Sequence, residues 1–133
     1  MPTITGAHHL ALTVTDAERS ATWYCDLLAL TRILEGSDES VTYRVLAHPG
    51  CGWIMGVRQY AAGVGGPFDE MRTGLDHLAF GVTSLAELHE WEVELERRSI
   101  PFTPAVETPI GTVVVCRDPD NIQLEFWLPL ATG

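Results

Sequence analysis

Hydrophobic and polar side chains alternate along residues 7–14, the first patterned segment of the chain. Leu10 and Leu12 fall on one face of an extended chain, and His9 falls on the other. A period of two predicts a half-buried strand in which His9 points away from the hydrophobic core. After residue 15 the apolar positions recur at helical intervals, so we expect an amphipathic helix directly after this strand.

The same pattern returns 68 residues further along the chain. Five of the seven residues at 9–15 recur at 77–83, where His77 stands in the place of His9. Beyond the helices the match continues with an offset one residue longer, so that Gly56 falls opposite Glu125. A repeat of this length predicts two copies of one structural unit that together fill nearly the whole chain.

Polar residues mark where the two helices begin. Thr15 and Glu18 have the spacing of a capping box, in which a hydroxyl and a carboxylate accept hydrogen bonds from the first turn. Ser84 and Glu87 repeat this spacing in the second copy. We expect the helices to end near residues 30 and 99, the latter shortly before a proline.

Segments rich in β-branched and aromatic residues follow each helix and predict three short strands in each copy. They lie at residues 32–34, 41–47 and 53–59, and then around 102, 112–116 and 122–128. The fold class is therefore α+β, with two pseudo-symmetric βαβββ units forming a curved mixed sheet. We place the first unit at residues 4–62, a flexible Gly- and Pro-containing linker at 63–74 and the second unit at 75–130, together one domain.

Charge and composition exclude several classes of protein. The formal charge of −10 repels phosphate backbones, so we expect no nucleic acid partner. No apolar run approaches the roughly 18 residues of a membrane helix, and the start of the chain lacks the layout of a secretion signal. Three widely spaced cysteines, Cys25, Cys51 and Cys116, are expected to be reduced and mostly buried. These features predict a cytoplasmic protein that does not contact membranes.

The alternation along the strands also indicates which polar side chains share a face. His9 and His77 lie opposite the apolar stripes of their strands, and Glu125 lies opposite Leu124 and Phe126 in the last strand. If the two units pack as symmetric halves of one sheet, these faces meet at a single cleft. We therefore expect the two imidazoles and the carboxylate to converge there.

Two imidazoles and one carboxylate form a ligand set for one divalent metal ion, which can be Fe, Mn, Zn, Ni or Co. Three protein ligands leave positions open for water or substrate, as in catalytic rather than structural sites. Burying the charge of Glu125 without a cation is costly, although an arginine such as Arg44 or Arg58 would serve as well as a metal.

Four stretches of the chain carry a resemblance to a known family. They span residues 8–16, 23–28, 74–80 and 117–126. These stretches resemble the vicinal oxygen chelate superfamily, which includes glyoxalase I, extradiol dioxygenases, methylmalonyl-CoA epimerase, fosfomycin-modifying thiol transferases and bleomycin-binding proteins. The resemblance covers about residues 4–128 and implies the glyoxalase/bleomycin resistance/dioxygenase fold.

The resemblance implies metal ligands on the first and last strands of each unit, at His9, Gly56, His77 and Glu125. Glycine has no side chain to offer, whereas glyoxalase I-like enzymes have a side-chain ligand at this second position, so the sequence argues against a glyoxalase I reaction. The remaining ligands are similar to those of extradiol dioxygenases and fosfomycin transferases. Ala11, where the transferases have a threonine, and the lack of their basic C-terminal segment argue against fosfomycin modification.

The function that this resemblance implies is that of a metal-dependent enzyme. Its substrate would be a small molecule chelated through vicinal oxygens, and its chemistry dioxygenase-like or lyase/isomerase-like. Glu125 is the candidate base, and Tyr43 and Arg58 are candidates to donate a proton or bind an anionic group. The alternatives are a bleomycin-resistance-type protein that sequesters a drug or natural product without catalysis, and a member that shares only the fold. A homodimer is expected, and units exchanged between its chains would join His9 of one chain to the partner's metal site.

Overall fold

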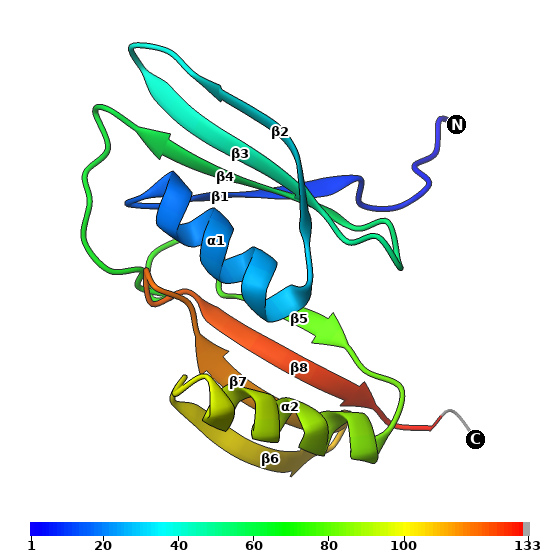
Figure 1. The fold of residues 1–133 in the computed structure, drawn as a ribbon. Helices are drawn as coiled ribbons and strands as arrows, with labels where there is room; N and C mark the ends of the chain where they lie inside the picture. The colour runs from blue at the N-terminus through cyan, green and yellow to red at the C-terminus, as the bar shows by residue number, and fades with distance from the viewer. Residues whose placement is uncertain (132–133) are drawn as a thin grey trace. The chain divides into compact units, whose positions relative to one another are not determined.

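The computed structural model describes residues 1–131 and divides the chain into two compact units, Met1–Gly66 and the part from Pro67 onward. Unit 1 contains β1 (His9–Thr13), α1 (Ala17–Leu28), β2 (Thr31–Ser37), β3 (Val41–Ala47) and β4 (Ile54–Tyr60). Unit 2 contains β5 (His77–Gly81), α2 (Leu85–Arg97), β6 (Phe102–Thr108), β7 (Gly111–Arg117) and β8 (Gln123–Pro129). Each unit is βαβββ (Figure 1), so the predicted fold class is confirmed.

Unit 1 forms a four-stranded mixed sheet in the order β1-β4-β3-β2, in which β1 and β4 run parallel and the other neighbours antiparallel. Helix α1 packs against one face of this sheet (Figure 1) and buries the apolar stripe expected from the alternation. The core includes Leu12, Ala21, Tyr24, Leu46, Met55 and Val57. The opposite face of the sheet is left for polar side chains such as His9.

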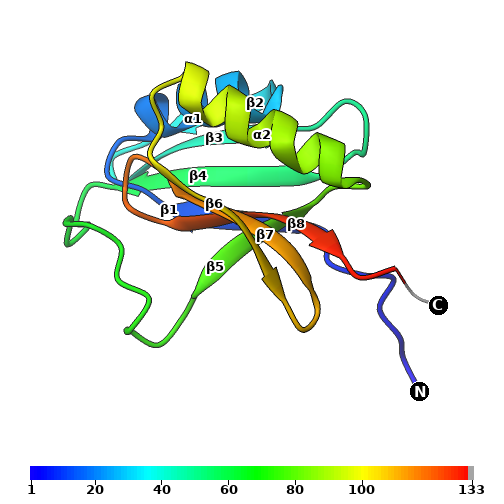
Figure 2. The ribbon, with the colours of Figure 1, turned by 90° about the horizontal axis from the view of Figure 1, so that it is seen from below.

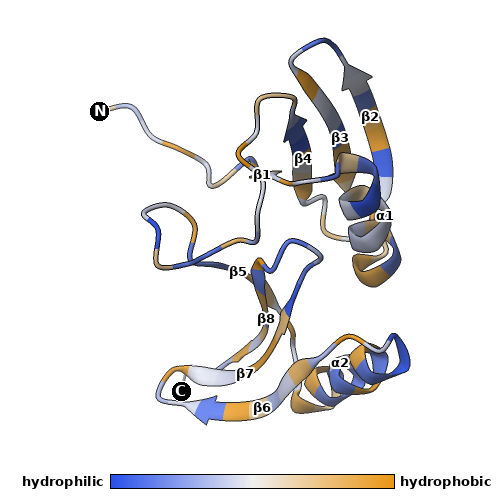
Figure 3. Cartoon of the chain, turned by 90° about the vertical axis from the view of Figure 1, so that its left-hand side faces the viewer, coloured by the Kyte–Doolittle hydropathy of each residue, from blue (hydrophilic) through white to orange (hydrophobic). Residues whose placement is uncertain are grey.

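Unit 2 repeats this architecture in the order β5-β8-β7-β6, and α2 lies along one face of the sheet (Figure 2). Hydrophobic and hydrophilic residues alternate around α2 (Figure 3), and the helix buries Leu88 and Leu95 against the sheet. Trp91 stacks on the buried ring of Phe126, with ring centroids 4.1 Å apart.

Strand register confirms the internal repeat at the level of single residues. In the parallel pair of unit 1, Ala11 lies opposite Gly56. In the parallel pair of unit 2, Ala79 lies opposite Glu125. Gly56 and Glu125 are therefore structural equivalents, as the sequence offset predicted.

The first predicted capping box is wrong, whereas the second cap is confirmed. Asp16, not Thr15, caps α1, because its carboxylate accepts from the backbone N–H of Arg19 and Glu18 is drawn away by Arg32. Ser84 does cap α2, accepting from the backbone of Glu87. The helices end at Leu28 and Arg97, two residues before the positions we expected.

The outer strands β2 and β6 are longer than the sequence predicted. Each contains residues with low strand propensity, such as Gly36 in β2 and Pro104 in β6. Each also shows a register shift, between Arg32 and Leu34 and between Thr103 and Val106. An edge strand tolerates such residues because one side of it forms no ladder, and propensity alone therefore underestimates its length.

Part of the segment predicted as a flexible linker is bonded to unit 2. The backbone N–H of Phe68 donates to the carbonyl of Asp120 at 2.7 Å, and Glu70 pairs with Arg117 of β7 at 2.8 Å. These bonds hold residues 68–70 against the turn between β7 and β8. In the described residues, no helix has the length and apolar character needed to cross a membrane.

Candidate metal and substrate site

The structure brings His77 and Glu125 together on the open face of unit 2. His77 begins β5 and lies opposite Gln123 in the parallel register with β8, so Glu125 follows two residues later on the same face. The Nε2 atom of His77 lies 3.5 Å from Oε2 of Glu125. This separation is long for a hydrogen bond. It is close to the distance of about 3.4 Å between two ligand atoms that each lie about 2.1 Å from one tetrahedral metal ion.

The carboxylate of Glu125 is buried, with its residue only 8% exposed, and no arginine pairs with it in the described residues. Arg44, one of the two alternative partners considered above, instead pairs with Glu18 and Glu35 in unit 1. Arg58, the other, hydrogen-bonds to Tyr60. The polar atoms within reach of Glu125 thus come from His77 and Gln123, an arrangement suited to a carboxylate that meets a cation from outside the chain.

Asp76 fixes the orientation of the His77 ring. Its Oδ1 atom lies 2.6 Å from Nδ1 of His77, which leaves Nε2 as the ring nitrogen that faces Glu125. Metal-binding histidines commonly donate their second ring N–H to a carboxylate in this way, which sets the tautomer and makes the free nitrogen a better ligand. Asp76 was not among the residues selected from the sequence.

Gln123 fixes the orientation of Glu125 in a similar way. Its amide nitrogen donates to Oε1 of Glu125 at 3.0 Å, and its amide oxygen accepts from Arg117 at 3.2 Å. Arg117 in turn donates hydrogen bonds to both carboxylate oxygens of Glu70, and these bonds lower the pKa of Glu70 to about 2. A continuous chain of polar contacts therefore runs from the segment before β5 to the candidate ligand Glu125.

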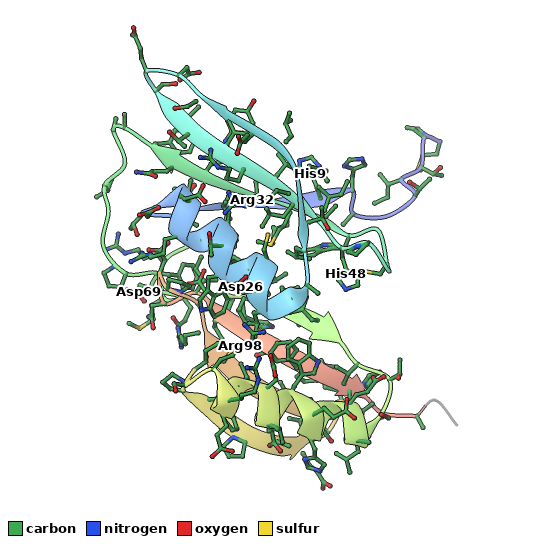
Figure 4. The ribbon with its side chains drawn as sticks, viewed as in Figure 1. His9, Asp26, Arg32, His48, Asp69 and Arg98 are labelled. Atoms are coloured by element: carbon green, nitrogen blue, oxygen red, sulfur yellow. The ribbon has the colours of Figure 1, made fainter. Side chains whose placement is uncertain are left out.

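His9 occupies the equivalent position at the start of β1 in unit 1 (Figure 4). Its Nδ1 atom lies 2.8 Å from Nδ1 of His8, and the two rings meet edge to face. The ring of His8 therefore contacts the ring of His9 rather than pointing away from it. His8 is the repeat equivalent of Asp76, so in both units the preceding residue contacts Nδ1 of the candidate ligand and leaves Nε2 as the nitrogen that could bind a metal.

A pocket of about 300 Å³ opens on the face of unit 1 that carries His9. Its walls come from β1, β2, β3 and β4 and consist of His8, His9, Ala11, Ile33, Tyr43, Arg44, Val45, Ile54, Gly56 and Arg58. Small side chains at Ala11 and Gly56 create this space, because they lie opposite each other in the register where unit 2 has Glu125. The structure thus places Tyr43 and Arg58 together with His9, while His77 and Glu125 lie together in unit 2.

Arg58 and Tyr43 line this pocket, and Arg58 also contacts Tyr60. The Nε of Arg58 donates to the hydroxyl of Tyr60 at 3.1 Å, and its guanidinium carbon lies 5.3 Å from the centre of the Tyr43 ring. Tyr43 lies across Gly36 of β2, where a Cβ atom would come within 2.5 Å of the ring. A glycine at this position therefore allows Tyr43 to lie beside Arg58 as a cation–π partner.

A histidine and two cysteines lie outside the candidate site. His48 lies in the turn between β3 and β4 (Figure 4), where its Nδ1 accepts from the backbone of Gly50 and Cys51. These bonds give His48 a structural role in the turn. Cys116 is buried, and burial raises the pKa of its thiol to about 12, whereas Cys51 is exposed, contrary to the expectation of mostly buried cysteines.

Each unit by itself supplies only part of the expected ligand set. In residues 1–131 no group of three or more His, Cys, Asp or Glu side chains is positioned to hold a metal ion. Unit 2 contributes two donors, and the third predicted ligand, His9, belongs to unit 1. The type and spacing of the donors at His77 and Glu125 fit a divalent cation.

Comparisons with known proteins identify the family. The chain matches the family model of the Glyoxalase/Bleomycin resistance protein/Dioxygenase superfamily over residues 6–126. It therefore belongs to this superfamily, and the resemblance seen in the sequence is confirmed. A comparison with curated proteins found no match.

Solved structures share the fold over nearly the whole chain. A glyoxylase/bleomycin resistance protein/dioxygenase domain from Frankia sp. EAN1pec is 35% identical, with a TM-score of 0.87 and coverage of 96% of this chain and 99% of its own. The fosfomycin resistance protein FosX from Listeria monocytogenes is 16% identical, with a TM-score of 0.75 and coverage of 97% of each chain. Another FosX structure, a mutant complexed with Mn(II) and 1S,2S-dihydroxypropylphosphonic acid, is 16% identical, with a TM-score of 0.71 and coverage of 94% of this chain and 90% of its own.

Proposed function

We propose that this protein is a metal-dependent enzyme that acts on a small substrate through adjacent oxygen atoms. His9, His77 and Glu125 would hold one divalent metal ion. The observation that carries the proposal is the pair His77–Glu125, whose facing atoms lie 3.5 Å apart and whose outer atoms are already engaged by Asp76 and Gln123. Hydrogen bonds that orient the ligand side chains in this way are typical of metal sites. An ordinary surface ion pair would gain little stability from them.

The donor set limits which ions would bind without selecting one. Imidazole nitrogen and carboxylate oxygen accept Fe(II), Mn(II), Zn(II), Ni(II) or Co(II). The Mn(II) in a FosX structure supports a divalent ion in this fold, although its 16% identity carries nothing about this chain's reaction. A bound ion of this kind would polarise a coordinated oxygen or acidify a neighbouring proton, in dioxygenase-like or lyase/isomerase-like chemistry.

Side chains of the protein would provide the base, the proton donor and the group that binds the substrate. Glu125 is the candidate base, because Gln123 holds its Oε1 and its Oε2, which faces His77, would accept a proton when released from the metal. The hydroxyl of Tyr43 can donate a proton, and Arg58 can hold an anionic group of the substrate, since both line the pocket beside His9. The apolar walls of this pocket would exclude water from the bound molecule.

Metal analysis tests this function directly. Protein purified without chelators is expected to contain about one equivalent of a transition metal, and His77→Ala and Glu125→Gln should lose it. His89→Ala is the matched control, because His89 is an exposed histidine of α2 that pairs with Glu92 on the same helix. The proposal is contradicted if wild-type protein contains no metal and the variants bind added metal as tightly as wild type.

Activity assays then separate the reaction types. Catechols, thiol adducts of 2-oxoaldehydes and acyl-CoA epimers should be tested with metal-loaded protein under air and under anoxia. Dependence on oxygen indicates a dioxygenase, and turnover without oxygen indicates a lyase or isomerase.

We further propose a cytoplasmic homodimer, and mixing variants shows whether its chains share metal sites. If His9 acts in its own chain, His9→Ala and His77→Ala cannot repair each other. If His9 binds the metal of its partner, a mixed dimer regains one intact site. Metal content recovered on mixing therefore identifies exchanged units, and none recovered identifies sites within one chain.

The second candidate function is sequestration of a ligand without catalysis. The pocket in unit 1 favours it, because this pocket contains a cation and apolar walls without any contribution from a metal. A sequestering protein should be free of metal and should bind its ligand equally well before and after treatment with EDTA.

A further inference from the structure

Arg58 differs from nearly all the other arginines of this acidic chain. The chain has 18 carboxylate residues against 8 basic ones, so most arginine side chains are expected to form an ion pair with a carboxylate. Ion pairs engage Arg32, Arg44, Arg72, Arg97, Arg98 and Arg117. Among the described residues, by contrast, no carboxylate lies within ion-pair distance of Arg58, whose contacts are with the hydroxyl of Tyr60 and the rings of two tyrosines. Arg58 contributes, after hydrogen bonds from Ser40 and Val41, to lowering the pKa of Asp38, but in the described residues the two side chains form no ion pair. A cation without an ion-pair partner at the wall of a pocket is available to a ligand.

The way Arg58 is held determines which atoms it can offer. Its Nε is used by Tyr60, so the two terminal nitrogens of the guanidinium remain for another acceptor. These two nitrogens form a planar fork that matches the two oxygens of a carboxylate. Tyr43 supports the plane of the fork from one side, with its ring centre 5.3 Å from the guanidinium carbon.

The charge of the pocket favours a ligand with a single negative charge. Arg44 also lines the pocket, but its side chain is committed to Glu18, to Glu35 and to the carbonyl of Tyr43. One available cation in a chain of net charge −10 balances a carboxylate better than a phosphate dianion, which usually draws several cations or a helix N-terminus.

The remaining walls indicate the body of the ligand. Ala11, Ile33, Val45 and Ile54 are apolar, and Gly56 leaves the floor between β1 and β4 without a side chain. A volume of about 300 Å³ is at the small end of ligand pockets. The floor without a side chain at Gly56 and the aromatic ring of Tyr43 in the wall suit a planar, unsaturated group better than a bulky one.

We propose that the pocket of unit 1 binds a small, planar, unsaturated or aromatic monocarboxylate, with the carboxylate on the terminal nitrogens of Arg58. The inference rests on the proposed function in treating this pocket as the substrate side of the site. It does not require the metal, since all the residues involved belong to unit 1.

Calorimetric titration of EDTA-treated protein with benzoate tests the inference. We expect benzoate to bind at least about tenfold more tightly than benzamide, its neutral analogue, because a hydrogen-bonded charge pair is lost. Cyclohexanecarboxylate and inorganic phosphate should also bind more weakly than benzoate. Equal affinity for benzoate and benzamide, or no benzoate binding at millimolar concentration, would overturn the proposal.

Two variants assign the binding to this pocket. Arg58→Met should weaken benzoate binding at least about tenfold, and Arg58→Lys should weaken it less, since lysine keeps the charge but loses the fork. Gly36→Ala should also weaken binding, because a Cβ there would displace the Tyr43 ring. Arg72→Met, at an exposed arginine of unit 2, is the control and should bind benzoate like wild type. Unchanged benzoate affinity in folded Arg58→Met and Arg58→Lys proteins would refute the assignment.

His77→Ala separates this inference from the proposed function. If this variant loses metal but keeps its affinity for benzoate, both the metal-dependent function and the carboxylate pocket are supported. Wild type that contains no metal yet binds benzoate through Arg58 supports the pocket while contradicting the metal-dependent enzyme. Wild type that contains metal but shows no preference for benzoate over benzamide overturns the pocket alone.

Discussion

Replacing Asp76 by asparagine isolates the effect of orienting His77. The change keeps the size of the side chain but removes the charge that lies 2.6 Å from Nδ1 of His77. Loss of such an outer partner typically weakens metal binding about 10- to 100-fold, which corresponds to about 1.4 to 2.7 kcal/mol of binding free energy. The fold should barely change, because the side chain of Asp76 is 68% exposed and exposed pairs contribute little to stability.

The assay is competition between the protein and a chelator for Mn(II) or Zn(II), with thermal unfolding of the metal-free protein as the measure of stability. Asp26→Asn is the matched control, because Asp26 is exposed on α1 and belongs to unit 1 (Figure 4). We expect weaker metal binding in Asp76→Asn alone and unfolding midpoints close to wild type in both variants. The reasoning is refuted if Asp76→Asn binds metal as tightly as Asp26→Asn does.

Three further changes test other parts of the account. Gly56→Glu should fold, since its Cβ would make an ordinary 3.5 Å contact in unit 1. It should tighten metal binding in chelator competition by adding a carboxylate to the strand beside His9, and weaker binding would contradict a metal site next to this strand. The pKa of Glu70 is lowered by its hydrogen bonds with Arg117, so this pair's stabilisation is complete above the usual pKa of 4.5 and is lost as the pH falls towards about 2. Glu70→Gln should therefore lower the unfolding midpoint near pH 7 and should differ little from wild type near pH 2; an equal difference at both pH values would exclude this pair as the cause. Phe126→Ala should lower the free energy of unfolding by about 3 to 5 kcal/mol in urea titrations, because the ring is fully buried, and a loss below about 1 kcal/mol would contradict its role in the core.

The repeat made much of the fold predictable. An offset that relates His9 to His77 also relates Gly56 to Glu125, and the strand registers reproduce that equivalence residue by residue. Alternation was sufficient to place both histidines and Glu125 away from the helices, since a strand has only two faces. Interior strands were located closely for the same reason, as β3 shows.

Residues that act through other side chains were not predictable from the pattern. Asp76 and Gln123 look like ordinary polar residues in the sequence, and their roles depend on distances of 2.6 and 3.0 Å across the fold. One signal was available, because Asp76 and His8 precede the two candidate ligands at the same repeat position. The predicted cap of α1 was wrong because Arg32 and Arg44 bind the carboxylate of Glu18. Asp16 caps the helix instead.

The central claim is that His9 joins His77 and Glu125 at one metal ion. The most direct measurement is the metal content and chelator-competition affinity of His9→Ala, compared with wild type and with His8→Ala. The account predicts about one metal ion per chain in wild type, near-complete loss in His9→Ala and weakened binding in His8→Ala. A His9→Ala protein that retains one metal ion at wild-type affinity would contradict it, because His77 and Glu125 would then bind the ion without unit 1.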